Sequence, residues 1–246
     1  MTLFAKLFTA LSIPLLLTGC LLIPGKFDSH LKLMNDGSYS FTYNGQMQMA
    51  EGDDNPMSSP PGMADEDSME NGAQGGGQQN AAMSSIFGGA IAGNDESLEK
   101  FATQLSKYDG WNKVEYMGDN LFEVEYAVTG NFDQNFAFPT IPGATMQFPF
   151  VQIIRRSGGE LEVLTPAMAG AGGLAGAMGP MPPGGTSKSK AQPIDGSFTI
   201  ETNGEVLSNN TADGYTSKGM VKKLHWKVNE ANSAKGGPAA IVKLTK

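Results

Sequence analysis

Alternating apolar and polar side chains are the feature that most limits what this chain can fold into. An Asn-Asp-Gly turn separates two alternating runs within residues 29–43, and Gly-Asp-Asn separates two more within 113–128. Further alternating runs lie within 151–164, 198–206 and 224–244. A period of two places apolar side chains on one face of a strand and polar side chains on the other. The chain therefore predicts antiparallel strands with one buried and one wet face.

One segment has helical periodicity instead. Apolar side chains recur at helical spacing on one face: Leu98, Phe101, Ala102, Leu105 and Tyr108. Asn94 is placed to cap the amino end of this helix, and Gly110 is placed to end it. We therefore expect an α+β fold, in which a mainly antiparallel β-sheet is covered by one amphipathic helix, with long disordered loops.

Two low-complexity segments interrupt the pattern. Residues 50–93 are rich in Gly, Ser, Asp, Gln and Pro, and residues 166–195 in Gly, Ala, Pro and Met. Neither has a hydrophobic period, so neither should enter a core. Because the 29–49 hairpin is marginal alone, it should pair with strands beyond the first segment. We expect residues 29–246 to form a single discontinuous domain with insertions at 50–93 and 166–195, and Asn203-Gly204 to form a tight hairpin turn.

The amino terminus has the layout of a secretory signal. Lys6 precedes an apolar run, Leu7 to Leu17, that is too short for a stable membrane span. The run ends in Leu17-Thr18-Gly19-Cys20, which resembles a bacterial lipobox, where the signal peptidase cuts before an acylated cysteine. Cys20 is also the only cysteine, so it has no disulfide partner within the chain.

These features predict residues 1–19 as a lipoprotein signal peptide, Cys20 as the lipid attachment residue and residues 20–28 as a tether. Two or three acyl chains, palmitate among them, would hold the protein on a membrane permanently, whereas one chain binds reversibly. Leu21 stands where an Asp would favour the inner membrane. We therefore expect a cell-envelope protein on the outer membrane, facing the periplasm. The alternative is a cytoplasmic protein with an apolar amino end and a chance cysteine.

Charge is spread unevenly along the chain. The net charge is −8, and between Leu33 and Glu99 there are eleven acids and no Lys or Arg. From Thr186 to Lys246 there are nine Lys against five acids. An acidic chain without clustered cations is a poor nucleic-acid binder, so we expect no nucleic-acid partner. The basic segment either contacts anionic headgroups or forms a solvated strand face.

The sequence offers no recognisable catalytic or metal site. His30 and His225 fall on polar strand faces, and nothing supplies a Cys–His pair or zinc spacing. Ser-x-x-Lys strings at Ser97 and Ser187 lack the companion motifs of penicillin-recognising enzymes. We predict no enzymatic activity, no cofactor and no metal. The alternative is a periplasmic enzyme whose carboxylates converge only in three dimensions: Asp119, Glu123, Glu125 and Asp213.

Five phenylalanines, interleaved with prolines, lie within residues 131–150: Phe132, Phe136, Phe138, Phe148 and Phe150. Proline disfavours a regular strand, so these rings should lie on an irregular loop. They either cap the sheet or form an apolar lip where a ligand enters. The lip is the candidate site for lipid.

Two stretches resemble the LppM-type domain of bacterial lipoproteins. The first is Leu31-Lys32-Leu33-Met34-Asn35-Asp36-Gly37-Ser38-Tyr39, and the second runs from Phe198 to Gly214 and on through Leu224 to Val228. The chain differs from that family in its two long low-complexity segments and in having no C-terminal transmembrane helix. The resemblance implies an envelope-facing α+β domain that contacts lipid, and it supplies no mechanism. We thus expect a membrane-anchored, non-enzymatic binding or structural module whose partner is a lipid or an envelope protein.

Overall fold

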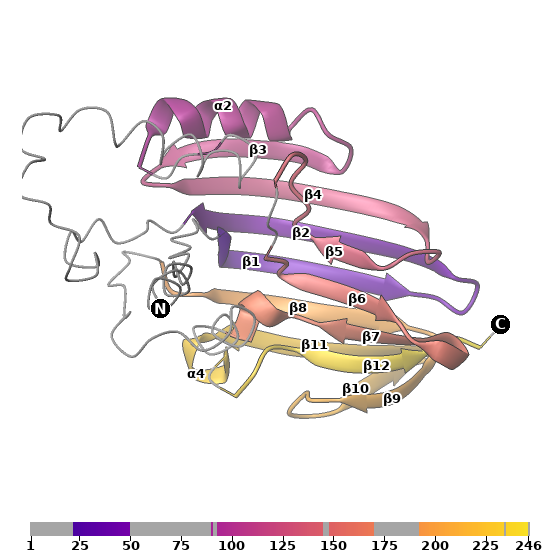
Figure 1. The fold of residues 1–246 in the computed structure, drawn as a ribbon. Helices are drawn as coiled ribbons and strands as arrows, with labels where there is room; N and C mark the ends of the chain where they lie inside the picture. Colours follow the sequence, from indigo (N-terminus) through magenta and orange to yellow (C-terminus); the bar gives the residue numbers. More distant parts are fainter. Residues whose placement is uncertain are drawn as a thin grey trace, which may run out of the picture.

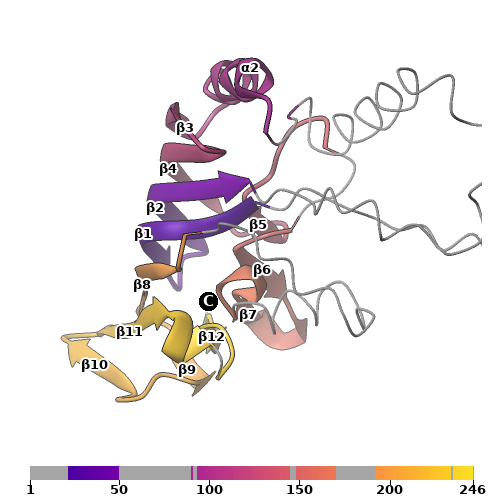
Figure 2. The ribbon, with the colours of Figure 1, turned by 90° about the vertical axis from the view of Figure 1, so that its left-hand side faces the viewer.

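The computed structural model describes residues 22–49, 90, 93–144, 148–169, 192–233 and 235–245. The predicted signal peptide, Cys20 and most of both low-complexity segments lie outside these residues. The described part consists mostly of β-strands in two sheets (Figure 1). Figure 2 shows the second sheet lying along one side of the first, with the core between them.

Sheet A has seven strands. In spatial order they are β10 (Tyr215–Lys218), β11 (Val221–Asn229), β8 (Asp195–Thr202), β1 (Leu22–Leu33), β2 (Ser38–Met49), β4 (Leu121–Asn131) and β3 (Trp111–Gly118). All neighbours are antiparallel except β1 and β8, which pair in parallel. Strands from both sides of the first low-complexity segment therefore share one sheet, as the marginal hairpin predicts.

Sheet B has five antiparallel strands. In spatial order they are β5 (Phe136–Phe138), β6 (Val151–Arg155), β7 (Glu160–Leu164), β12 (Ala239–Lys243) and β9 (Glu205–Asn209). The helical elements are α2 (Asp95–Leu105), α4 (Glu230–Ser233) and the 3-10 turns η2 (Ser157–Gly159) and η3 (Pro166–Ala169).

The prediction that one helix covers the whole sheet is wrong. Sheet A is mixed, and helix α2 packs at its edge against β3 rather than across its face (Figure 1). A helix about 10 Å wide covers two or three strands, whereas seven strands at about 4.8 Å spacing span about 29 Å. Sheet B covers the rest of the inner face, which a single helix is too small to do.

Helix α2 begins where the sequence predicts and ends earlier. The Asn94 side chain accepts a hydrogen bond from the Ser97 amide, which is a helix cap. The apolar stripe is buried from Leu98 to Leu105. The helix stops at Leu105, and Tyr108 is 47% exposed instead of completing the stripe. Gly110, with a positive φ of 88°, serves the turn into β3 instead of the end of the helix.

Two further boundaries differ from the prediction. Strand β1 starts at Leu22, so residues 22–28 are paired strand and not tether. Asn203-Gly204 does not close a hairpin, because β8 lies in sheet A while β9 pairs with β12 in sheet B. The chain turns a corner between the sheets at this dipeptide.

The margins of the low-complexity segments belong to the core. Ala90 and Met168 are fully buried, and Ile194 is nearly so. The prediction that these segments contribute nothing to the core is therefore wrong at their ends. Met168 lies in η3 and Ile194 adjoins β8, so the burial of these two residues costs little additional chain entropy.

Candidate functional site

The five phenylalanines predicted as a cap or a ligand lip lie mainly between the sheets. Phe138 and Phe150 are fully buried, and Phe132 is 7% exposed. Phe136 and Phe148 are half-buried. The expected irregular loop contains a short strand, β5, which stops at Phe138 because Pro139 follows.

Phe138 occupies the centre of an aromatic cluster that joins sheet B to sheet A. Its ring centroid lies 4.6 Å from that of Tyr126, 5.0 Å from Phe41 and 5.1 Å from Tyr43. Trp111 follows at 5.7 Å and Phe150 at 6.0 Å. Offset and edge-to-face pairs at these distances stabilise a core beyond the burial of their area. Within the described part of this loop, three of the five rings are buried and two are half-buried, an arrangement closer to a cap than to an exposed lip.

The four carboxylates of the enzymatic alternative are not brought together. Glu123 and Glu125 share one face of β4, and Asp119 lies in the turn before it. Asp213 precedes β10, and four strands separate β10 from β4 in sheet A. At about 4.8 Å per strand the separation is about 24 Å. These residues therefore cannot act on one substrate atom in this arrangement.

A hollow of about 280 Å³ beside α2 includes the first Ser-x-x-Lys string. Ser97 and Lys100 both line it, yet the Lys100 Nζ lies 2.5 Å from the Glu96 carboxylate. The ion pair engages this lysine on an exposed helix face, so it is not placed to act as a base on Ser97. Within the described residues no cluster of three or more His, Cys, Asp and Glu side chains could hold a metal ion.

Both histidines lie on the outer face of sheet A, the face turned away from sheet B, because they alternate with buried residues of β1 and β11. His30 on β1 and His225 on β11 each pair in register with Thr199 on β8. They are thus about 10 Å apart across the sheet. The Thr199 hydroxyl and the His225 Nδ1 are hydrogen-bonded at 3.0 Å. Alternation in the sequence predicts the polar face but not the strand order that brings the two histidines into one row.

His30 lies in a small charged group on this face. Its Nε2 is 3.5 Å from the Glu201 carboxylate, which also lies 3.8 Å from the Lys32 Nζ. Burial lowers the pKa of His30 below its usual value, and Lys32 and Lys223 act in the same direction, while Glu201 opposes them. At neutral pH the imidazole is therefore uncharged, and it packs as a polar, neutral ring.

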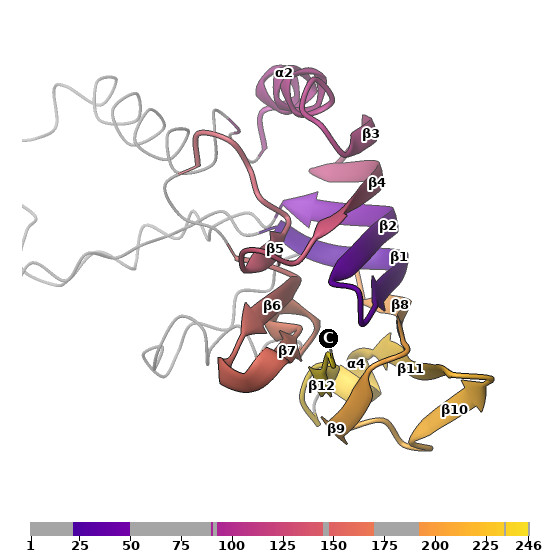
Figure 3. The same cartoon turned by 90° about the vertical axis from the view of Figure 1, so that its right-hand side faces the viewer.

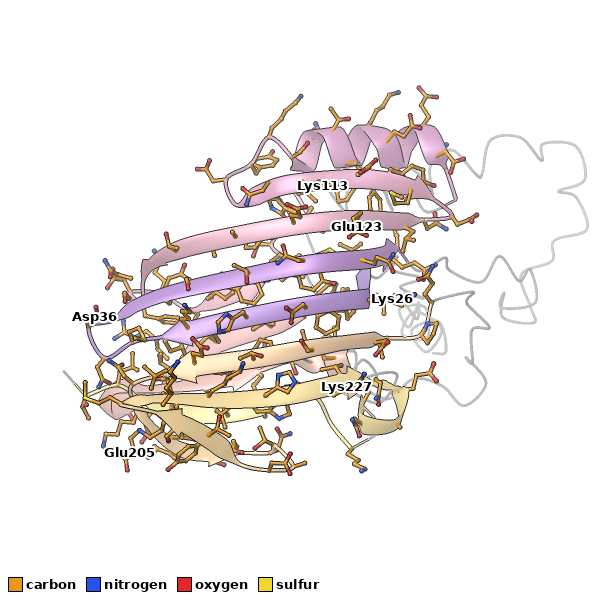
Figure 4. The ribbon with its side chains drawn as sticks, turned by 180° about the vertical axis from the view of Figure 1, so that it is seen from behind. Lys26, Asp36, Lys113, Glu123, Glu205 and Lys227 are labelled. Carbon is orange, nitrogen blue, oxygen red and sulfur yellow. The ribbon has the colours of Figure 1, made fainter. Side chains whose placement is uncertain are left out.

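The outer face has charges of both signs. Figure 4 shows Lys26 over β1, Lys227 over β11, Glu123 over β4 and Lys113 over β3. By strand alternation the same face also has Lys32, Lys223, Glu125 and Glu115. The lysines of the C-terminal segment are spread over β10, β11 and β12, so they belong to two sheets. This spread is typical of solvated strand faces and not of a concentrated cationic patch.

The amino end of β1 places the fold next to the predicted lipid attachment residue. Leu22 is 5% exposed and pairs with Met49, so the ordered sheet starts two residues after Cys20. The sequence gives no sign of this closeness, because residues 22–28 lack clean alternation and contain Pro24 and Gly25. No helix in the described part of the chain is both long and apolar enough to cross a bilayer.

Comparison with known proteins yields no sequence match and a weak structural one. No family model matches the sequence, and no curated protein matches it. A structural match links the chain to the folded domain of LppM from Mycobacterium tuberculosis, solved by NMR, over 93% of this chain and 92% of that one. The two share 14% identity and a TM-score of 0.30. This is the family that the sequence resembles, but such a score is too low to establish a common fold.

Proposed function

We propose that this protein is a membrane-anchored envelope lipoprotein, a non-enzymatic binding or structural module attached through acylated Cys20. The observation that carries the proposal is the lone cysteine at the end of a signal-like run, Lys6 to Gly19. The described structure is compatible with it, because every described element lies after Cys20. Cleavage before Cys20 would leave all described elements in place.

The interior supports a binding or structural role over an enclosed ligand site. The aromatic rings between the sheets fill the region where an apolar ligand was expected to enter. The outer face of sheet A has no covering element in the described structure (Figure 3). We propose that this polar face is the surface presented to an envelope partner, while the acyl chains supply the contact with lipid.

The experiment that tests anchoring is substitution of Cys20. Wild-type protein and the Cys20→Ser variant are expressed with their native signal, and membranes are separated by density and extracted with detergent. Wild type should fractionate with the outer membrane, and Cys20→Ser should lose membrane attachment. Leu21→Asp is the matched control, which should keep attachment and move the protein to the inner membrane. A Cys20→Ser protein that remains in the membrane fraction would show that the anchor is elsewhere.

A further inference from the structure

The elements at the amino end of β1 form one end of the molecule. Register places Met49 opposite Leu22, and the start of β4 next to Gln48. The turn from β3 to β4 lies at the same level, so Met117 and Asp119 belong to this end. Strand β8 also starts here, since Asp195 pairs with Lys26. In Figure 1 these elements lie together on the left.

Two helices complete this end. Asn229 of β11 pairs with Asp195, so helix α4 follows directly beyond it. Helix α2 starts here as well, because the Tyr116 hydroxyl donates a hydrogen bond to Asp95. We call the anchor end the set formed by Leu22, Met49, Met117–Asn120, Asp95, Asp195 and Glu230–Ser233.

The covalent chain limits how far the anchor end can lie from acylated Cys20. Two residues span at most about 7 Å, even when fully extended. Leu22 is buried and paired, so it cannot detach to lengthen the connection. The predicted tether of residues 20–28 would have allowed free rotation, whereas paired strand from Leu22 onward leaves only two residues of chain between Cys20 and the sheet.

We propose that the anchor end faces the lipid headgroups and that the strands of sheet A lead away from the bilayer. This inference rests on the proposed lipid anchor at Cys20. In this orientation the anchor end contacts the membrane, and the outer face of sheet A is exposed sideways to the periplasm. Met117, 56% exposed, is the large apolar side chain that the described anchor end offers to the interface.

The charge of the anchor end excludes a simple electrostatic attraction to anionic lipid. Among its described residues the acids are Asp95, Asp119, Asp195 and Glu230, and the nearby described lysines are Lys26, Lys227 and Lys235. The acids outnumber the lysines, so anionic headgroups would repel this end weakly. The short covalent connection, and not surface charge, therefore sets the orientation.

The opposite end provides a matched reference. Met220 lies in the turn from β10 to β11, close to the level of Thr202 and Leu33. Leu33 is eleven residues along β1 from Leu22, or about 35 Å at the usual rise of a strand. Met220 is 82% exposed, so both methionines can be replaced without disturbing the core.

The test labels each end in turn. Acylation consumes the Cys20 thiol, so Met117→Cys or Met220→Cys gives the mature lipoprotein a single free thiol for a fluorophore. Each labelled lipoprotein is inserted into phosphatidylethanolamine–phosphatidylglycerol vesicles, with or without nitroxide-headgroup lipid. The unacylated Met117→Cys chain from residue 21 controls for non-specific contact.

We expect the nitroxide lipid to quench the label at 117 strongly and to leave the label at 220 unchanged. Equal quenching at both ends, stronger quenching at 220, or no quenching at either end in protein that floats with the vesicles would overturn the orientation and leave the anchor intact. Protein that fails to float with the vesicles would overturn the anchor, and the orientation with it.

Discussion

Removal of the Phe138 ring should destabilise the fold more than loss of any surface side chain. The ring is fully buried and lies within 6.0 Å of five aromatic centroids, four on sheet A and that of Phe150, just before β6. Truncation of such a phenylalanine to alanine costs about 3–5 kcal/mol, because transfer energy is lost and a cavity remains. We expect Phe138→Ala to fall in this range. For a domain of this size that corresponds to a melting temperature lower by about 10 °C.

Urea unfolding of the unacylated chain from residue 21 measures this loss. Trp111 lies 5.7 Å from Phe138 and Trp226 lies near Phe198, so tryptophan fluorescence monitors sheet A from two places. Met220→Ala, at an exposed turn, is the control and should change the free energy of unfolding by less than about 0.5 kcal/mol. A loss of under about 1 kcal/mol for Phe138→Ala would refute the buried position and restore the exposed lip.

Three more predictions follow from named contacts. Gly196→Ala should cost about 1–3 kcal/mol in urea unfolding, because its Cβ would lie 2.5 Å from the carbonyl oxygen of Phe27; a neutral result would contradict the β1–β8 pairing. Burial raises the pKa of Tyr43 well above its usual value, so its contribution to stability is complete below about pH 10 and is lost as pH rises further. Unfolding measured from pH 8 to 11 should therefore be less pH-dependent in Tyr43→Phe, and an unchanged slope would exclude this tyrosine as the source. Native mass spectrometry of the unacylated chain purified from cells should show no bound lipid, since aromatic rings fill the space between the sheets; a stoichiometric lipid adduct would disprove a filled interior.

Local pattern predicts the strands and the start of the helix well. The 29–49 hairpin, the β3–β4 turn, the β6–β7 pair and the Asn94 cap all follow from alternation, turn residues or capping chemistry. These features depend on neighbours within a few residues, which the sequence displays directly. The polar positions of His30 and His225 follow from the same alternation.

Pairing between strands that are distant in the sequence could not be predicted from local pattern. Nothing local reveals that β1 lies parallel to β8, or that the chain changes sheets at Asn203-Gly204. The burial of Phe138 also could not be predicted, because a proline-rich aromatic loop has the same sequence pattern whether it caps a core or borders a groove. The start of β1 at Leu22 was missed because Pro24 and Gly25 interrupt the alternation, while pairing with β2 still holds the segment.

The mass of the amino-terminal peptide shows directly whether Cys20 carries lipid. Protein extracted from membranes is digested, and its first peptide is identified by mass spectrometry. For a lipoprotein this peptide should begin at Cys20 and carry two or three acyl chains. A mature protein that begins at Met1, or that contains an unmodified Cys20, would contradict the proposed lipid anchor.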